Sequence, residues 1–222
     1  MPPSLRSRDI LLLLLAVTTG ASDATAFERL GHAFASVITG NLVLLGVGGA
    51  RGDGQLALFA GCALAGYAIG VIIAAPRRGE HADQGADWPV HATNALIIDL
   101  GFLIAFAIGW ELTSGRPAHT MQFVLLSIAG AAMGAQSTAV RRLGQLSTTY
   151  LTSTLTGLLE ALATWRLSGG HLRSIGIIAM AVLGAAAGTA LVVYARRLLP
   201  LLQLGPLVIV ILASRRWIRS PA

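Results

Sequence analysis

Long apolar blocks dominate this sequence and set the strongest limit on how it can fold. Of its 222 residues, 55% are hydrophobic and only 12% are charged, about half the charged share of an average soluble domain. A helix that crosses a bilayer needs about 20 mostly apolar residues, and the blocks approach that length. The sequence therefore predicts an all-α, polytopic transmembrane helix bundle that forms a single membrane domain over residues 1–222. The blocks lie at about 10–27, 33–49, 55–75, 91–110, 121–139, 147–165, 174–195 and 198–213.

The positive charge of the chain fits a membrane topology better than nucleic-acid binding. The net charge is +6, and all sixteen basic residues are arginine. They lie in short connectors between apolar blocks, and cytoplasmic loops of membrane proteins carry such an excess of positive charge. We therefore expect the lipid bilayer as a partner and no nucleic acid.

The first block reads either as a cleaved signal peptide or as a helix that stays. Arg6 and Arg8 precede the apolar run, and the Ala-Thr-Ala sequence at 24–26 has the small-x-small form of a cleavage site. Cleavage would destroy half of an internal repeat that is present in the full chain. We therefore expect residues 10–27 to remain as the first transmembrane helix.

That repeat consists of two sets of landmarks separated by 113 residues. The sequence TAFERLG at 25–31 corresponds to TAVRRLG at 138–144, and TGNL at 39–42 corresponds to TSTL at 152–155. Asp23 falls opposite Gln136 at the same offset. The sequence thus predicts two similar repeats, at about 10–112 and 121–214.

Two glycine pairs also correspond between the repeats. Gly66 and Gly70 precede an Arg-Arg pair, as do Gly184 and Gly188. A spacing of four places both glycines of a pair on one helix face, where neighbouring backbones can approach closely. We predict that these four residues pack helices together.

The motifs of both repeats resemble a known family. The stretch GASDATAFERLGHAFASVITGNLVLLG at 20–46 resembles the signature of the YoaK family, bacterial membrane proteins with a domain of unknown function. The stretch AMGAQSTAVRRLGQLSTTYLTSTLTG at 132–157 resembles its second conserved block, with Thr152-Ser153 where Thr-Gly is expected. The resemblance covers nearly the whole chain. It implies a multi-pass protein of the bacterial inner membrane and no particular reaction.

The number of full spans stays open between six and eight. If all eight blocks cross, each repeat has four spans, the repeats share one orientation, and the arginines divide nine to seven between the two sides. If blocks 33–49 and 147–165 dip into the membrane and return, six helices cross and the repeats point in opposite directions. The arginines then divide eleven to five, which the orientation rule favours. Both arrangements place the N-terminus in the cytoplasm.

Asp23 and the Thr39-Gly40-Asn41 triplet are the first candidate site residues. A carboxylate at membrane depth costs about 2.5–3.5 kcal/mol and usually faces the bundle interior. Asp23 could bind a proton, a cation or a substrate, or it could cap the turn at 28–31 or pair with Arg29. Gly40 permits a helix break of the kind at which transporters bind substrate. The alternative role of the triplet is close helix packing.

The other candidates are polar residues inside later blocks. Asp99 and Glu160 are acids within apolar stretches and are candidates for proton coupling, or they hydrogen-bond a neighbouring helix. Gln136 is the counterpart of Asp23. Thr152 and Thr154 are the counterparts of the residues in the first triplet.

No enzyme, metal or cofactor signature stands out. His81, Asp83 and Asp87 lie in one polar loop, and without a second cluster at ligand spacing a solvated loop is the better interpretation. The sequence contains no nucleotide-binding glycine-rich loop, no Gly-x-Ser-x-Gly elbow and no His-Glu-x-x-His motif. We expect no bound metal, no cofactor and no catalytic activity.

Two functional hypotheses follow. The first is a small-solute or proton-coupled secondary transporter or permease, with Asp23, Asn41, Asp99, Thr152 and Glu160 near one mid-membrane cavity. The second is a non-transporting protein, either an intramembrane enzyme or a scaffold that binds a partner, with a closed, dry interface between the repeats. The solute or ion is unidentified in the first case, and homo-oligomerisation is left open in both.

Overall fold

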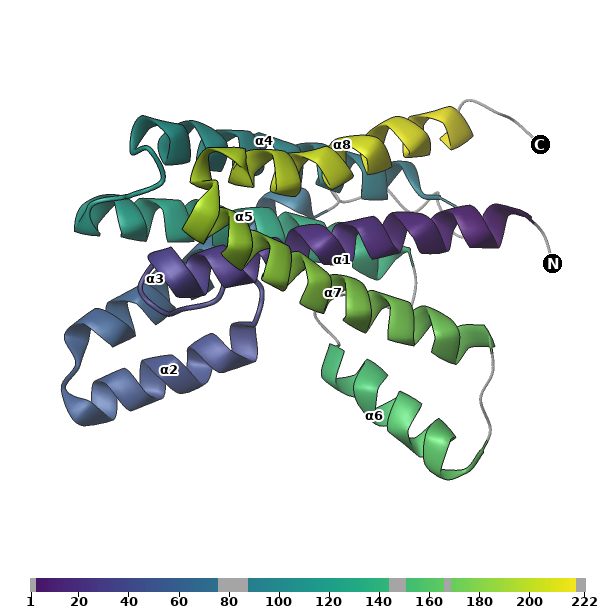
Figure 1. Cartoon of the computed structure of the whole chain (residues 1–222), viewed down its shortest axis with the longest axis horizontal. Helices are drawn as coiled ribbons and strands as arrows, with labels where there is room; N and C mark the ends of the chain where they lie inside the picture. Colours follow the sequence, from purple (N-terminus) through teal and green to yellow (C-terminus); the bar gives the residue numbers. More distant parts are fainter. Residues whose placement is uncertain (1–2, 76–87, 144–150, 166–168, 219–222) are drawn as a thin grey trace.

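A computed structural model describes residues 3–75, 88–143, 151–165 and 169–218, which are almost entirely helical (Figure 1). No strand occurs in these ranges, so the predicted all-α class is confirmed. Short connections join most of the helices. The elements are α1 (Pro3–Arg29), α2 (Ile38–Arg51), α3 (Gly54–Ala74), α4 (Val90–Leu112), α5 (His119–Arg142), α6 (Leu151–Ala163), α7 (Gly169–Tyr194), the 3₁₀ turn η2 (Arg196–Leu198) and α8 (Leu199–Ile218).

Six helical stretches in the described part of the chain are long and apolar enough to cross a membrane. Helices α2 and α6 have only 14 and 13 residues. At 1.5 Å per residue they extend about 20 Å, less than the roughly 30 Å of a hydrocarbon core. The structure therefore favours six spans over eight. The candidate spans are Arg8–Arg29, Gly54–Ala74, Val90–Leu112, His119–Arg142, Arg173–Tyr194 and Arg196–Arg215.

Four of the long helices form a closed ring. Helix α5 contacts α1 and α4, and α8 contacts the same two helices from the other side. Helices α3 and α7 pack outside this ring, α3 against α5 and α7 against α1, while the short helices α2 and α6 pack on α3 and α7. Helix α5 is the most enclosed span, with 78% of its apolar window buried, followed by α1 with 61%. The core of the protein therefore lies along α1 and α5.

Glycines bring α3 against α5 at backbone distance. A Cβ atom at Gly66 would overlap the carbonyl oxygen of Ser127, and one at Gly70 would overlap that of Ala131. Gly134 of α5 faces α3 in the same way. These two helices therefore pack with no side chain between their backbones at the crossing, as small residues allow in membranes.

The α1–α7 contact is built in the same manner. A Cβ atom at Gly184 would overlap the backbone of Val17, and one at Gly188 would lie 3.0 Å from the Cα of Ala21. Gly20 of α1 faces the backbone of α7 in turn. The two glycine pairs of the sequence thus lie in two separate helix contacts, each against the first helix of the other half of the chain.

Candidate functional site

The segment between α1 and α2 folds back along α1 instead of continuing away from it. Gly31 and His32 have positive φ angles of 83° and 58°, which reverse the chain after Arg29. The carboxylate of Asp23 then accepts hydrogen bonds from the Ser36 backbone N–H at 2.7 Å and from the Ser36 hydroxyl at 2.6 Å. Asp23 lies six residues before the end of α1, so Ser36 returns about 9 Å along the helix axis. Asp23 thus holds this segment, and its bonding partner is Ser36 rather than Arg29 or the turn at 28–31.

Asn41 closes the same segment from the α2 side. Its side chain is fully buried, its Oδ1 accepts from the Phe34 N–H at 3.0 Å, and its Nδ2 donates to the Phe34 carbonyl at 2.7 Å. The break in the helix therefore lies at 30–37, before the Thr39-Gly40-Asn41 triplet, which forms the first turn of α2. Thr39 is exposed, and Gly40 packs near the side chain of Val37.

A second group of polar side chains lies inside the four-helix ring. Gln136 of α5 is 1% exposed, and its Nε2 donates to the Thr19 hydroxyl of α1 at 2.7 Å. Gln203 of α8 is also buried, and its Nε2 donates to the Ser22 hydroxyl of α1 at 3.3 Å. The Thr18 hydroxyl donates to the backbone carbonyl of Gln203 at 3.3 Å. Helices α5, α1 and α8 are thereby linked through one polar layer.

Asp99 is a buried acid on α4, one of the four helices of this ring. Its side chain on α4 is 0% exposed, and neither carboxylate oxygen has a hydrogen-bond partner among the described residues. Gly109 of α4 lies against Leu125 of α5, and the two helices run antiparallel. Moving ten residues along each helix from that contact brings Asp99 to the level of Ala135 and Gln136. Within the described residues, the Oε1 of Gln136 is likewise buried without a hydrogen-bond partner, so unpaired acceptors occur on both helices at about the same depth.

The remaining candidate residues lie away from this layer or outside the described part. Glu160 is exposed on α6, which packs on α7 outside the ring. Thr152 and Thr154 belong to the start of α6, and their side chains are outside the description. The loop residues His81, Asp83 and Asp87 also lie outside the described residues. The structure thus groups Asp23 with Asn41 at the fold-back segment and brings Asp99 of α4 to about the depth of Gln136 of α5.

Sequence reasoning missed several polar residues of the ring, above all Gln203 and the α1 hydroxyls. The available signal was an amide side chain within the apolar block 198–213 and a Thr-Thr pair at 18–19 within the first block. Serine and threonine can bond to their own helix, so their presence alone does not reveal a contact between helices. Thr25, for example, donates to the Ala21 carbonyl four residues earlier at 2.7 Å.

Comparison with known proteins places the chain in a family. The family described as "Protein of unknown function (DUF1275)" matches residues 11–213. The chain belongs to this family. A curated relative, the UPF0700 transmembrane protein YoaK of Bacillus subtilis (strain 168), is 37% identical over 155 residues, which cover 69% of this chain and 66% of the relative. No solved structure matches the chain. The resemblance to the YoaK family is therefore confirmed, and this DUF1275 protein is a multi-pass membrane protein.

Proposed function

We propose that this DUF1275 protein is a small secondary transporter or permease that moves a small solute, with or without coupled protons. The observation that carries the proposal is Asp99, an acid in the middle of a candidate span whose two oxygens have no hydrogen-bond partner in the described structure. Ionisable groups at bilayer depth are costly and typically serve ion, proton or substrate pathways. The layer of Gln136 and Gln203 offers further polar atoms from the same helix ring.

The contact pattern supports the proposed internal repeat. The repeat matches α1, α2, α3 and α4 with α5, α6, α7 and α8, so each helix contact in the structure should have a counterpart between the matched helices. The α1–α7 contact has its counterpart in α5–α3, the α1–α8 contact in α5–α4, and the α2–α3 contact in α6–α7. With three spans and one short helix in each half, the halves at about 10–112 and 121–214 would have opposite orientations. Many secondary transporters consist of such inverted repeats and bind substrate where the repeats meet.

We place the protein in the inner membrane, with the start of α1 and the end of α8 on the cytoplasmic side. Helix α1 begins and α8 ends at the same end of the bundle (Figure 1). In the six-span arrangement eleven of the sixteen arginines lie on that side, which the positive-inside rule assigns to the cytoplasm.

Cysteine labelling tests this topology, because Cys62 is the chain's single cysteine. In a Cys62→Ala background, Gln55→Cys is expected to react with a membrane-impermeant maleimide in intact spheroplasts. Arg215→Cys is expected to react only after permeabilisation. Both positions are exposed in the structure. Eight full spans would place both positions on one side, so equal labelling of the two variants would contradict the six-span topology, and a reversed pattern would contradict the orientation.

Substitution of Asp99 tests the transport site. Asp99→Asn keeps the shape of the side chain and removes a buried acid, so we expect the thermal unfolding midpoint of the purified protein to stay the same or rise. A solute that stabilises the wild type should require roughly tenfold or more higher concentration to stabilise Asp99→Asn, because a charged hydrogen bond contributes about 1.5–3 kcal/mol. The measurement is unfolding across a library of small polar metabolites and ions, followed by uptake into proteoliposomes.

Glu111→Gln is the matched control, since Glu111 is an exposed acid at the end of the same helix. It should bind the solute as the wild type does. If Asp99→Asn retains full solute binding and uptake, Asp99 has no role in transport. If no solute stabilises or crosses with the wild type, a non-transporting function is favoured instead.

A further inference from the structure

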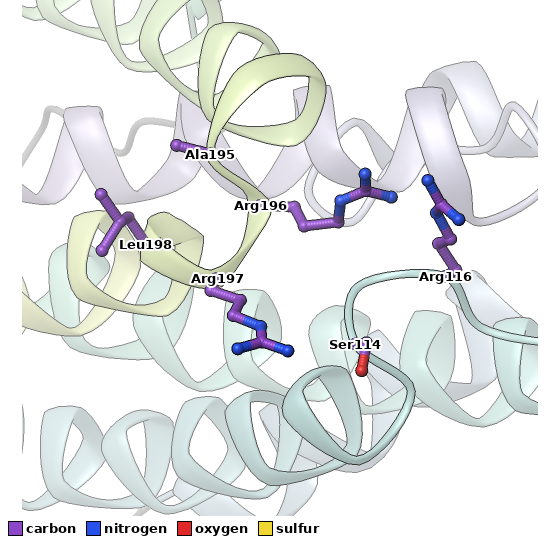
Figure 2. A pocket seen from close by; sticks show the side chains of 6 residues that line it. All are labelled: Ser114, Arg116, Ala195, Arg196, Arg197 and Leu198. Carbon is purple, nitrogen blue, oxygen red and sulfur yellow. The ribbon is translucent and has the colours of Figure 1, made fainter.

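An arginine-lined pocket lies at the opposite end of the bundle from the start of α1. It opens between the connection that follows α4 and the η2 turn that precedes α8, and it has a volume of about 520 Å³. Figure 2 shows three guanidinium groups gathered around this opening, with one hydroxyl group beside them. Its lining residues are Ser114, Arg116, Ala195, Arg196, Arg197 and Leu198.

The walls of this pocket are held by specific contacts. Ser114 and Gly115 have positive φ angles of 50° and 66°, and Gly115 donates its N–H to the Trp110 carbonyl at 2.9 Å to end α4. The fully buried Trp110 in turn donates its indole N–H to the carbonyl of Arg196 at 2.9 Å. A Cβ atom at Gly115 would come within 2.8 Å of the Arg196 Cδ, so the stem of this arginine lies directly on the glycine. These contacts hold the pocket backbone and the stem of Arg196 in place.

The charge of the pocket is unbalanced. None of its three arginines forms an ion pair with an acidic side chain in the described part of the chain. The nearest acid in sequence, Glu111, is exposed and lines a separate groove with Ala107, Ile108 and Leu112. Like charges around one hollow repel each other, and an anion placed among them would remove this repulsion. The planar guanidinium group matches phosphate and carboxylate oxygens with paired hydrogen bonds.

The positive-inside rule does not account for this cluster under the proposed topology. The six-span arrangement leaves five arginines on this outer side, and three of them line one pocket. We propose that Arg116, Arg196 and Arg197, with Ser114, form a binding site for a tetrahedral oxyanion such as a phosphate or sulfate group. The group belongs either to a free anion or to the headgroup of a surrounding anionic lipid. The site is independent of whether the protein moves a solute through the helix ring.

The test uses the double variant Arg116→Gln/Arg197→Gln, because both side chains are exposed and neither supports the packing on Gly115. Arg215→Gln, an exposed arginine at the other end of α8, is the matched control. The thermal unfolding midpoint of the full chain is measured in neutral detergent against increasing sodium phosphate and sodium sulfate, with ionic strength held constant by sodium chloride. A second arm compares phosphatidylcholine nanodiscs with and without phosphatidylglycerol.

We expect phosphate or sulfate to raise the midpoint of the wild type and of Arg215→Gln, and the double variant to need roughly tenfold or more anion for the same shift. Stabilisation by phosphatidylglycerol alone, lost in the double variant, would identify the lipid headgroup as the ligand. If neither arm stabilises the wild type beyond the chloride control, or if the double variant responds equally, the proposal is overturned. Should the glutamine variant fail to fold, Arg116→Lys/Arg197→Lys replaces it, and unchanged anion binding by that variant would overturn the role of the guanidinium groups.

Discussion

Replacing Gly70 with leucine is expected to prevent the helix bundle from assembling. Even a Cβ atom at this position would overlap the carbonyl oxygen of Ala131 on α5. A backbone atom cannot move aside as the end of a side chain can, so α3 and α5 would have to separate. Overpacking typically costs 1–3 kcal/mol, and separation would also remove the close contacts at Gly66 and Gly134. We therefore expect Gly70→Leu to lower stability by about 3 kcal/mol or more.

Gly61→Leu provides the matched control on the same helix. A Cβ atom at Gly61 would meet no atom of the described residues within 4 Å, so the added side chain points into space that lipid can occupy. The measurements are the yield of monodisperse protein in detergent and its thermal unfolding midpoint. Gly61→Leu should behave as the wild type does, while Gly70→Leu should be lost to aggregation or unfold at a much lower temperature. Equal behaviour of the two variants would show that α3 and α5 do not pack as described.

The apolar blocks predicted the long helices well because a membrane span is fixed mainly by length and hydropathy. The blocks at 55–75 and 91–110 correspond to α3 (Gly54–Ala74) and α4 (Val90–Leu112). Hydropathy did not reveal that the block at 33–49 begins with a non-helical return. That return depends on a hydrogen bond between Asp23 and Ser36, which are 13 residues apart, and such a tertiary contact leaves no trace in an average over neighbouring residues.

The candidate site was predictable in its parts and not in its arrangement. An acid inside an apolar block indicated Asp99, and the offset of 113 residues indicated Gln136. Their similar depth depends on the register of α4 against α5, in which Gly109 lies against Leu125. Gln203 was missed because nothing in its own block shows that it faces Ser22 of another helix. Contacts between helices distant in sequence decide these points, and a single sequence carries little information on them.

Replacing Asp23 with alanine is expected to release the fold-back segment at 30–37 without dissolving the bundle. The substitution removes the acceptor of both the Ser36 N–H and the Ser36 hydroxyl, and Ser36 is only 6% exposed. A buried donor left without a partner costs about 1–3 kcal/mol, so we expect the two Ser36 donors together to lower the free energy of unfolding by about 3 kcal/mol. For a chain of this size that corresponds to a fall of roughly 6–12 °C in the thermal unfolding midpoint. Hydrogen exchange should also become faster at 30–41.

Asp53→Ala is the control that distinguishes the release of the fold-back segment from a general effect of removing a hydrogen-bonding carboxylate. Asp53 bonds the exposed Leu56 N–H at 3.0 Å as the cap of α3, so its removal should cost about 1 kcal/mol and leave exchange at 30–41 unchanged. Ser36→Ala removes only the hydroxyl and should lie between the two. In the double variant Asp23→Ala/Ser36→Ala, the effects should be less than additive, because the single changes break the same contact. If Asp23→Ala matched Asp53→Ala in both measurements, the segment would be held by the Asn41 to Phe34 hydrogen bonds alone, and α2 rather than α1 would position it.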